Sequence, residues 1–244
     1  MGRFEGKVVL VTGSSSGIGR KTAEAFDAEG ARVAVNSARS VEAGQAVAAA
    51  LADGFYVQAD VSDAASCDAL VEAVLEHYGR LDVLVNNAGV TKVIPHRDLD
   101  AVDDDLFRWI LEVNVVAPFR LARRCMPHLV ATDDGCIVNV SSLAGVRPTG
   151  SSIPYAVSKA ALNHLTVLLS NVVGPSVRVN AVAPGLVRTP WTSEWHELHA
   201  SMARRAPLKR SGEADEVADA VVSLAANRYV TGQVLVVDGG LGLR

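Results

Sequence analysis

Short runs of β-branched residues alternate with longer alanine-rich stretches along the chain, and this alternation most narrows the folds available to it. The short runs predict strands and the longer stretches predict helices. Because the runs are nearly all apolar, the strands must be covered by helices on both faces, as in a parallel sheet. Right-handed crossovers then give a doubly wound α/β fold.

The element boundaries follow from the same pattern. Strands are predicted at residues 7–11, 32–35, 55–58, 82–85, 136–140, 177–182 and 234–237. Helices are predicted at residues 17–29, 41–51, 64–77, 103–130, 153–172 and 215–226. No linker, low-complexity tract or internal repeat interrupts the series, so residues 1–244 are expected to form a single domain. Residues 190–210 hold Trp191, Trp195 and a basic cluster instead of an apolar element, and we expect them to form a substrate lid.

Composition excludes several classes of protein. The 244 residues are 49% hydrophobic and carry a net charge of −4, which is typical of a globular protein and not of a nucleic-acid binder. Three widely spaced cysteines, Cys67, Cys125 and Cys136, form no metal-binding pattern, and we interpret them as reduced and structural. The N-terminus shows neither a signal peptide nor a membrane span, and Gly6 replaces the Ser or Thr needed for myristoylation. We therefore predict a cytosolic protein without a metal or membrane partner.

A glycine-rich turn, Thr12-Gly13-Ser14-Ser15-Ser16-Gly17-Ile18-Gly19, joins the first predicted strand to the first predicted helix. Glycines let the backbone turn sharply and let a pyrophosphate approach the N–H groups of the helix N-terminus. The spacing is a variant of the dinucleotide fingerprint, and a plain tight turn is the alternative. Its place after the first strand of a βαβ unit favours dinucleotide binding.

The end of the second predicted strand bears on which dinucleotide is bound. An acid at this position binds the ribose of NAD, whereas a cation accommodates the 2′-phosphate of NADP. Here the sequence is Val35-Asn36-Ser37-Ala38-Arg39-Ser40, without an acid and with Arg39 available to pair with a phosphate. This favours NADP(H) over NAD(H). The alternative is that Arg39 is only a solvated surface charge.

Tyr155 and Lys159 stand four residues apart on one face of a predicted helix. A tyrosine has a pKa near 10, and a nearby ammonium in a partly dry cleft can lower that pKa by about two to three units. Such a pair is common on helix surfaces. Ser142, thirteen residues upstream, follows a predicted strand and would lie at a carboxyl end, where open α/β sheets bind ligands.

These features occur together with others in a fixed order, and nearly the whole chain resembles the single-domain branch of the short-chain dehydrogenase/reductase family. The matching motifs are Thr12-Gly13-x-x-x-Gly17-Ile18-Gly19, Asp60-Val61, Asn86-Asn87-Ala88-Gly89, Asn114, Ser142, Tyr155-x-x-x-Lys159, Pro184-Gly185-x-x-x-Thr189 and Val237-Asp238-Gly239-Gly240. The resemblance implies a Rossmann-like sheet of seven strands in the order 3-2-1-4-5-6-7. It also implies hydride transfer between a nicotinamide dinucleotide and a carbonyl or alcohol.

The resemblance further assigns catalytic roles. Tyr155 would exchange a proton with the substrate oxygen, which Ser142 would bind by a hydrogen bond. Lys159 would lower the pKa of the tyrosine and hold the nicotinamide ribose, and Asn114 would relay protons from the lysine at a helix irregularity. Ser141 is a rival for Ser142, but the interval to Tyr155 favours Ser142.

Cofactor contacts are predicted for a larger set, in which the residues after the third and fourth strands bind adenine and its ribose, and those after the sixth orient the nicotinamide. This set is Gly13, Ser15, Ser16, Gly17, Ile18, Gly19, Ser37, Arg39, Asp60, Val61, Asn87, Ala88, Gly89, Tyr155, Lys159, Pro184, Gly185, Val187 and Thr189. The alternatives are that Asn86 and Asn87 are turn formers, that Pro184-Gly185 is a bend and that Asp60 is a helix cap.

The substrate is less constrained. Reductases in this branch act on 3-oxoacyl carrier proteins, sugars, steroids and small alcohols. Thr132-Asp133-Asp134-Gly135 stands where carrier-protein reductases typically have a base, which disfavours an acidic carrier protein. Four bases remain to compensate for this change: Arg123, Arg124, Arg204 and Arg205.

Three further alternatives stay open. Thr91, His96, Trp191 and Trp195 are candidates to face substrate, with lid packing the equal alternative. The resemblance implies a homotetramer or homodimer packed through the helices at residues 103–130 and 153–172. A catalytically silent dinucleotide sensor is the competing class of function, since fold alone does not establish chemistry.

Overall fold

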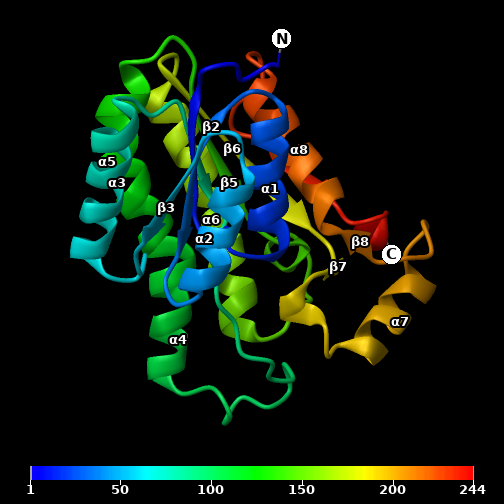
Figure 1. Ribbon diagram of the computed structural model, residues 1–244. Helices are drawn as coiled ribbons and strands as arrows, with labels where there is room; N and C mark the ends of the chain where they lie inside the picture. Colours follow the sequence, from blue (N-terminus) through cyan, green and yellow to red (C-terminus); the bar gives the residue numbers. More distant parts are fainter. Residues whose placement is uncertain (1, 244) are drawn as a thin grey trace.

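The centre of the molecule is a parallel sheet of seven strands, seen in a computed structural model that describes residues 2–243 (Figure 1). Its strand order is β3-β2-β1-β4-β5-β6-β9, which confirms the predicted order 3-2-1-4-5-6-7. The strands are β1 Val8–Val11, β2 Arg32–Ser37, β3 Gly54–Gln58, β4 Val83–Asn86, β5 Gly135–Val140, β6 Val177–Pro184 and β9 Val234–Val237.

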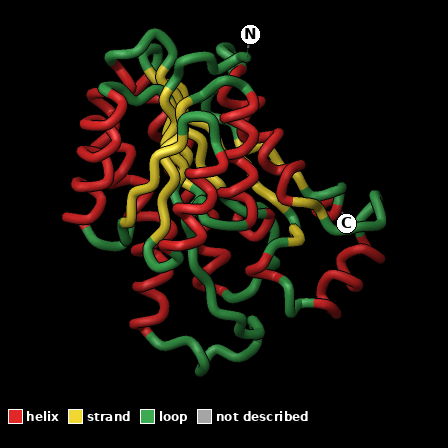
Figure 2. Tube along the Cα trace, in the orientation of Figure 1, coloured by secondary structure: helices red, strands yellow, loops and turns green. Residues whose placement is uncertain are grey.

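Helices cover both faces of this sheet, as the apolar strands require (Figure 2). They are α1 Gly17–Ala28, α2 Val41–Ala50, α3 Ala64–Tyr78, α4 Asp104–Leu111, α5 Ala117–Val130, α6 Ile153–Val173, α7 His196–Arg205 and α8 Ala214–Ala226. Side chains of α1, α2 and α8 pack on one face, and those of α3, α5 and α6 pack on the other.

Alternation along each strand divides the core into two layers. In β1, Val9 and Val11 face the α1 and α8 side, whereas Val8 and Leu10 face the α3 and α5 side. All four side chains are completely buried. Cys67, Cys125 and Cys136 are also buried and unpaired, as predicted, and burial raises the pKa of each thiol.

Two parts of the chain differ from the prediction. The helix predicted at residues 103–130 is interrupted by a π-helical segment, Glu112–Val116, between α4 and α5. An apolar periodic pattern does not reveal one extra residue in a turn, so the pattern alone predicts a continuous helix there, whereas the resemblance implies an irregularity at Asn114. A separate two-stranded sheet, β7 Val187–Arg188 with β8 Gly212–Glu213, was not predicted because each strand has only two residues.

The predicted lid region begins with a short 3₁₀ segment, η3 Pro190–Thr192, and continues into α7. In Figure 1, α4 and α7 lie apart from each other beneath the sheet, at the carboxyl ends of its strands. No helix within residues 2–243 combines the length and apolar character needed to span a membrane. The same residues contain no cluster of three or more His, Cys, Asp or Glu side chains suited to a metal ion.

Candidate active site

A cavity of about 650 Å³ opens at the carboxyl ends of the strands, where doubly wound sheets bind ligands. Every residue of the predicted cofactor set lines this cavity, and so does Ser142. Three of the four catalytic candidates, Ser142, Tyr155 and Lys159, therefore line the same cavity. Asn114 is fully buried and lies behind the cavity wall.

The glycine-rich turn forms one end of the cavity and is held by polar side chains of neighbouring strands. Asn87 Nδ2 donates to the carbonyl oxygens of Thr12 at 2.8 Å and Gly13 at 3.0 Å. Asn36 Oδ1 accepts from the Gly13 N–H at 3.3 Å. Asn87 is therefore more than a turn former, because it joins the turn to the end of β4.

Glycine is required at two positions of this turn. Gly13 has φ +63°, and a Cβ there would lie 2.9 Å from the Ala88 Cα. A Cβ at Gly19 would lie 2.4 Å from both Asn87 Nδ2 and the Gly13 carbonyl oxygen. The turn thus leaves a cradle of bare backbone at the N-terminus of α1, which fits the pyrophosphate of a dinucleotide.

The next part of the cavity lies at the ends of β2 and β3. Ser37 Oγ donates to the Ser40 carbonyl at 3.0 Å and lies 2.9 Å from the Tyr56 hydroxyl. Arg39 is exposed and borders the cavity. Asp60 Oδ1 accepts from the N–H and hydroxyl of Ser62, so Asp60 also stabilises the turn before α3. This neighbourhood fits the adenosine end of a dinucleotide.

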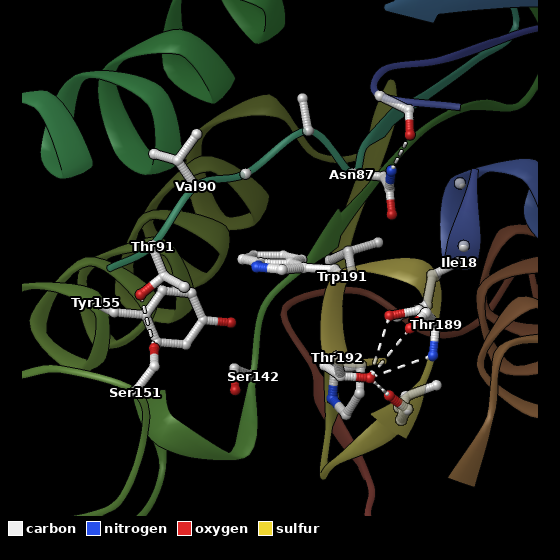
Figure 3. A pocket seen from close by; sticks show the side chains of 18 of the residues that line it. Ile18, Asn87, Val90, Thr91, Ser142, Ser151, Tyr155, Thr189, Trp191 and Thr192 are labelled. Atoms are coloured by element: carbon white, nitrogen blue, oxygen red, sulfur yellow. Dashed lines mark hydrogen bonds between the residues drawn. The ribbon is translucent and has the colours of Figure 1, made fainter. Parts of the chain in front are cut away.

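The opposite end of the cavity holds the reactive side chains. Figure 3 shows the hydroxyl groups of Tyr155 and Ser142 facing the same space, with the indole of Trp191 lying across the cavity. Ser152 caps α6 by accepting from the Tyr155 N–H, which fixes the first turn of the helix that carries Tyr155. Ser142 follows β5, and its Oγ accepts from the Ala144 N–H at 3.2 Å.

Lys159 is oriented by the backbone of β5. Its Nζ donates to the Val140 carbonyl at 2.9 Å and lies 5.8 Å from the centre of the Tyr155 ring. The side chain is buried, and burial lowers the pKa of Lys159 from 10.5 to about 8. At neutral pH the lysine is therefore still charged, beside the tyrosine ring.

The predicted acidification of Tyr155 is absent from this geometry. Burial raises the pKa of Tyr155, and a hydrogen bond from Ser142 acts in the opposite direction. The expected contribution of Lys159 to the pKa of Tyr155 is missing because its ammonium is directed at the Val140 carbonyl and not at the phenol oxygen.

Asn114 organises the wall behind the lysine. Its Oδ1 accepts from the Val90 N–H at 2.9 Å, and its Nδ2 donates to the Val90 carbonyl and to Ser158 Oγ, each at 3.0 Å. Asn114 lies in the π-helical segment, so the irregularity implied by the resemblance is present. A Cβ on Gly89 would lie 3.3 Å from Asn114 Oδ1 and 3.6 Å from Lys159 Nζ, which shows how closely the two groups approach.

Ser158 was not singled out from the sequence, whereas the preference for Ser142 over Ser141 agrees with the structure. Ser158 is buried, accepts from Asn114 and donates to the Tyr155 carbonyl at 2.7 Å, which links the π-helical segment to α6. Its place between Tyr155 and Lys159 was the available signal. Ser141 Oγ donates to the Lys159 carbonyl at 3.2 Å, so its hydroxyl supports α6 while Ser142 faces the cavity.

Of the four candidates for substrate contact, Thr91, Trp191 and Trp195 line the cavity and His96 does not. Trp109 of α4 lines it as well and was not predicted. Thr91 Oγ1 lies 2.6 Å from Ser151 Oγ, within hydrogen-bond distance.

The acidic pair before β5 is partly neutralised. Asp134 forms ion pairs with Arg178 at 3.2 Å and with Arg228 at 3.0 Å. The repulsion that the sequence predicts toward an acidic partner therefore falls mainly to Asp133.

Comparisons with known proteins agree on the kind of protein this chain is similar to. A family model described as enoyl-(acyl carrier protein) reductase matches residues 13–242. A protein of Streptomyces violaceoruber, named as a candidate ketoacyl reductase 2 of the granaticin polyketide synthase, is 55% identical over 98% of this chain and 97% of its own length. The 3-oxoacyl-[acyl-carrier-protein] reductase FabG of Thermotoga maritima is 38% identical over 98% and 99% of the two chains. A short-chain dehydrogenase/reductase structure from Brucella melitensis, named glucose/ribitol dehydrogenase, superposes with a TM-score of 0.92 at 32% identity and covers 99% of both chains.

Proposed function

This chain belongs to the short-chain dehydrogenase/reductase family, and from that premise we propose that it uses NADP(H) to interconvert a ketone and a secondary alcohol. One observation carries the proposal. A single cavity is bordered at one end by the glycine-rich turn and at the other by the hydroxyls of Ser142 and Tyr155. A dinucleotide bound along it has room to meet a carbonyl at those hydroxyls.

The nucleotide end supports NADP(H) over NAD(H). The N-terminus of α1 would bind the pyrophosphate, and Arg39 would pair with the 2′-phosphate because no carboxylate stands at the end of β2 to repel it. Pro184, Gly185, Val187 and Thr189 would hold the nicotinamide end. When bound, the nicotinamide supplies or accepts the hydride.

The chain's own residues handle the proton. Tyr155 would donate its phenolic proton to the carbonyl oxygen as that oxygen gains charge, while Ser142 binds the same oxygen by a hydrogen bond. The Lys159 ammonium would stabilise the phenolate left behind. This role requires the ammonium to turn from the Val140 carbonyl, toward which the structure directs it, to the phenol oxygen. In the reverse direction Tyr155 accepts the proton.

Substrate class is proposed from the named relatives. Both curated relatives are named for ketoacyl or 3-oxoacyl reduction, which supports a 3-oxoacyl thioester or a ketone derived from one. A carrier protein would approach the cavity mouth, near which α7 ends in Arg204 and Arg205. Both are exposed, and neither forms an ion pair within residues 2–243.

A cytosolic location stays a prediction.

We also propose a homo-oligomer. Several large apolar side chains are about half exposed on the helices that the resemblance assigns to a subunit interface, among them Val116, Phe119, Val157 and Leu168. Light scattering after gel filtration is expected to give the mass of a tetramer or a dimer. A monomer at micromolar concentration would contradict the assignment.

The proposed reaction is tested by incubating the protein with NADPH and a panel of ketones, 3-oxoacyl thioesters and sugars. A fall in NADPH absorbance, with a secondary alcohol recovered as product, is expected for at least one ketone. NADPH binding without turnover on any substrate would instead favour a silent dinucleotide sensor. A lower KM for NADH than for NADPH would overturn the cofactor choice.

A further inference from the structure

The substrate end of the cavity has an apolar wall made by four side chains of residues 190–205. This wall, called the lid wall below, consists of Trp191, Trp195, Leu198 and Met202. Trp109 of α4 borders the same cavity, and Figure 1 places α4 apart from α7 beneath the sheet. The side chains of Trp109, Trp191 and Leu198 are 43%, 50% and 41% exposed. These large apolar side chains therefore face the opening of the cavity and are not packed in the core.

Within the lid wall, Trp191 packs against the catalytic candidate Tyr155. Its indole meets the Tyr155 ring edge to face, with ring centres 6.4 Å apart and an interplanar angle of 88°. Figure 3 shows the indole lying across the cavity, between the side that carries Tyr155 and the side that carries Ile18 and Thr189. A ketone whose oxygen reaches Tyr155 therefore has this indole beside it.

The position of Trp191 is fixed by its neighbours. Pro190 opens the short segment η3, and the buried Thr192 closes it, with Oγ1 donating to the Val187 carbonyl at 2.7 Å. His199 Nε2 lies 3.2 Å from the Thr192 carbonyl, and His199 Nδ1 lies 2.8 Å from Ser211 Oγ. Because a carbonyl only accepts, Nε2 carries the proton and the Ser211 hydroxyl donates to Nδ1. These contacts fix the backbone next to Trp191.

Apart from Lys159, the charged side chains that line the cavity lie at its nucleotide end. Among the lining residues, all within the described chain, the charged side chains are Arg39, Asp60 and Lys159. Arg39 follows β2 and Asp60 follows β3, so they lie about three and four strand spacings, or about 14 and 19 Å, from β5 and Ser142. Lys159 is turned to the Val140 carbonyl. Apart from Lys159, the substrate end thus offers no charged side chain to bind a carboxylate or a phosphate. Its aromatic and aliphatic surface lies beside hydroxyl groups such as those of Thr91, Ser142 and Ser151.

We infer that Trp191 determines substrate choice, and that it selects a neutral ketone carried on a flat, apolar ring system over a short linear ketone. This inference rests on the proposed ketone reduction and names the substrate class of that site. The ring body would stack or lie edge-on against the indole, and the carbonyl oxygen would project toward Tyr155 and Ser142.

The test compares two neutral ketones with NADPH: α-tetralone, which is bicyclic and aromatic, and ethyl acetoacetate, which is short and linear. Wild-type kcat/KM is expected to be at least about tenfold higher for α-tetralone. Trp191→Ala should lower kcat/KM for α-tetralone about 30-fold and that for ethyl acetoacetate less than threefold, because only the ring loses its contact surface. Trp191→Phe, which keeps an aromatic face, should retain activity on α-tetralone within about threefold.

Two controls separate specificity from damage. Leu208→Ala removes an exposed apolar side chain next to the lid wall but outside the cavity, and both ketones should be reduced at wild-type rates. The NADPH dissociation constant of Trp191→Ala should stay within about twofold of the wild-type value. Equal losses on the two ketones, or a wild-type enzyme without preference for α-tetralone, would overturn the inference while leaving ketone reduction standing. Absence of turnover on both ketones and on the wider panel would overturn the proposed function itself.

Discussion

The two ends of the cavity are built in opposite ways. The nucleotide end is made of backbone held by buried polar groups: Ser14 Oγ donates to the Val11 carbonyl at 2.7 Å and accepts from the Asn36 N–H at 3.0 Å. The apolar wall of the substrate end comes from residues 190–205, which include α7, a helix in which no residue is buried. The first is fixed by the core of the sheet, and the second rests on a few surface contacts.

This contrast explains how one scaffold combines a constant reaction with a variable substrate. Turn geometry at the nucleotide end tolerates few residue types, since a Cβ at Gly13 or Gly19 would collide with backbone. Side chains of the lid wall can change size without disturbing the core. The comparison predicts that small substitutions at the nucleotide end strongly weaken cofactor binding. Substitutions at the substrate end should change the kinetics of particular ketones and leave cofactor binding unchanged.

The largest effect is expected from Gly19→Val. The new side chain would meet Asn87 Nδ2 and the Gly13 carbonyl, which closes the cradle for the pyrophosphate. NADPH binding, measured by fluorescence titration, should weaken more than 1,000-fold. Gly212→Ala is the matched control, because the nearest side chain to its Cβ, that of Val187, is 3.7 Å away. Wild-type affinity in Gly19→Val would show that the turn does not bind the cofactor.

Lys159→Met should separate activity from stability. Loss of the ammonium is expected to lower kcat about 100-fold. The pKa shift from 10.5 to about 8 means that burying the charge costs about 3 kcal/mol, from which the lost hydrogen bond to Val140 subtracts about 1 kcal/mol. The variant should therefore be about 2 kcal/mol more stable at pH 7, measured by urea denaturation. A less stable variant would contradict this account of Lys159.

The wild-type protein checks the same physics through pH. Because the pKa of folded Lys159 lies below its unfolded value, the unfolded chain binds more protons between about pH 8 and pH 10.5. This group alone therefore makes the free energy of unfolding rise with pH across that window. Ketone reduction should fall as pH rises through about 8, when the ammonium is lost. If the rate of ketone reduction instead stays unchanged up to pH 10, the charge of Lys159 is not used in the reaction.

Arg39→Ala should give a smaller and selective effect. Removing the guanidinium is expected to raise the KM for NADPH about tenfold and to leave the KM for NADH unchanged, because only NADPH carries the 2′-phosphate. Arg123→Ala, an exposed arginine outside the cavity, is the control. Unchanged KM values for both cofactors would mean that Arg39 is a solvated surface charge.

The smallest effect is expected from His199→Ala, which cuts the link between Thr192 and Ser211. A looser lid should raise the KM for the ketone about threefold and leave the NADPH dissociation constant unchanged. His196→Ala, on the same helix but outside the cavity, should have no effect. A change in cofactor affinity instead would place His199 with the nucleotide end.

The sequence predicts the first end of the cavity better than the second for the same physical reason. The apolar strands and the glycine turn are local patterns with few structural solutions, and the strand order implied by the resemblance is confirmed. All cofactor candidates line one cavity, and their contacts with a cofactor stay predictions. The π-helical segment at Asn114, the orientation of Lys159 toward Val140 and the place of Trp109 depend on tertiary packing that no local pattern encodes. For the same reason, the sequence does not decide which side chains of residues 190–205 form the lid wall.

The central claim is that the Tyr155 hydroxyl supplies the proton for carbonyl reduction. Single-turnover decay of NADPH absorbance, with enzyme in excess and saturating ketone, tests this claim for the wild-type protein and Tyr155→Phe. We predict that both proteins bind NADPH with similar affinity and that hydride transfer in Tyr155→Phe is about 1,000-fold slower. Comparable single-turnover rates in the two proteins would contradict the claim.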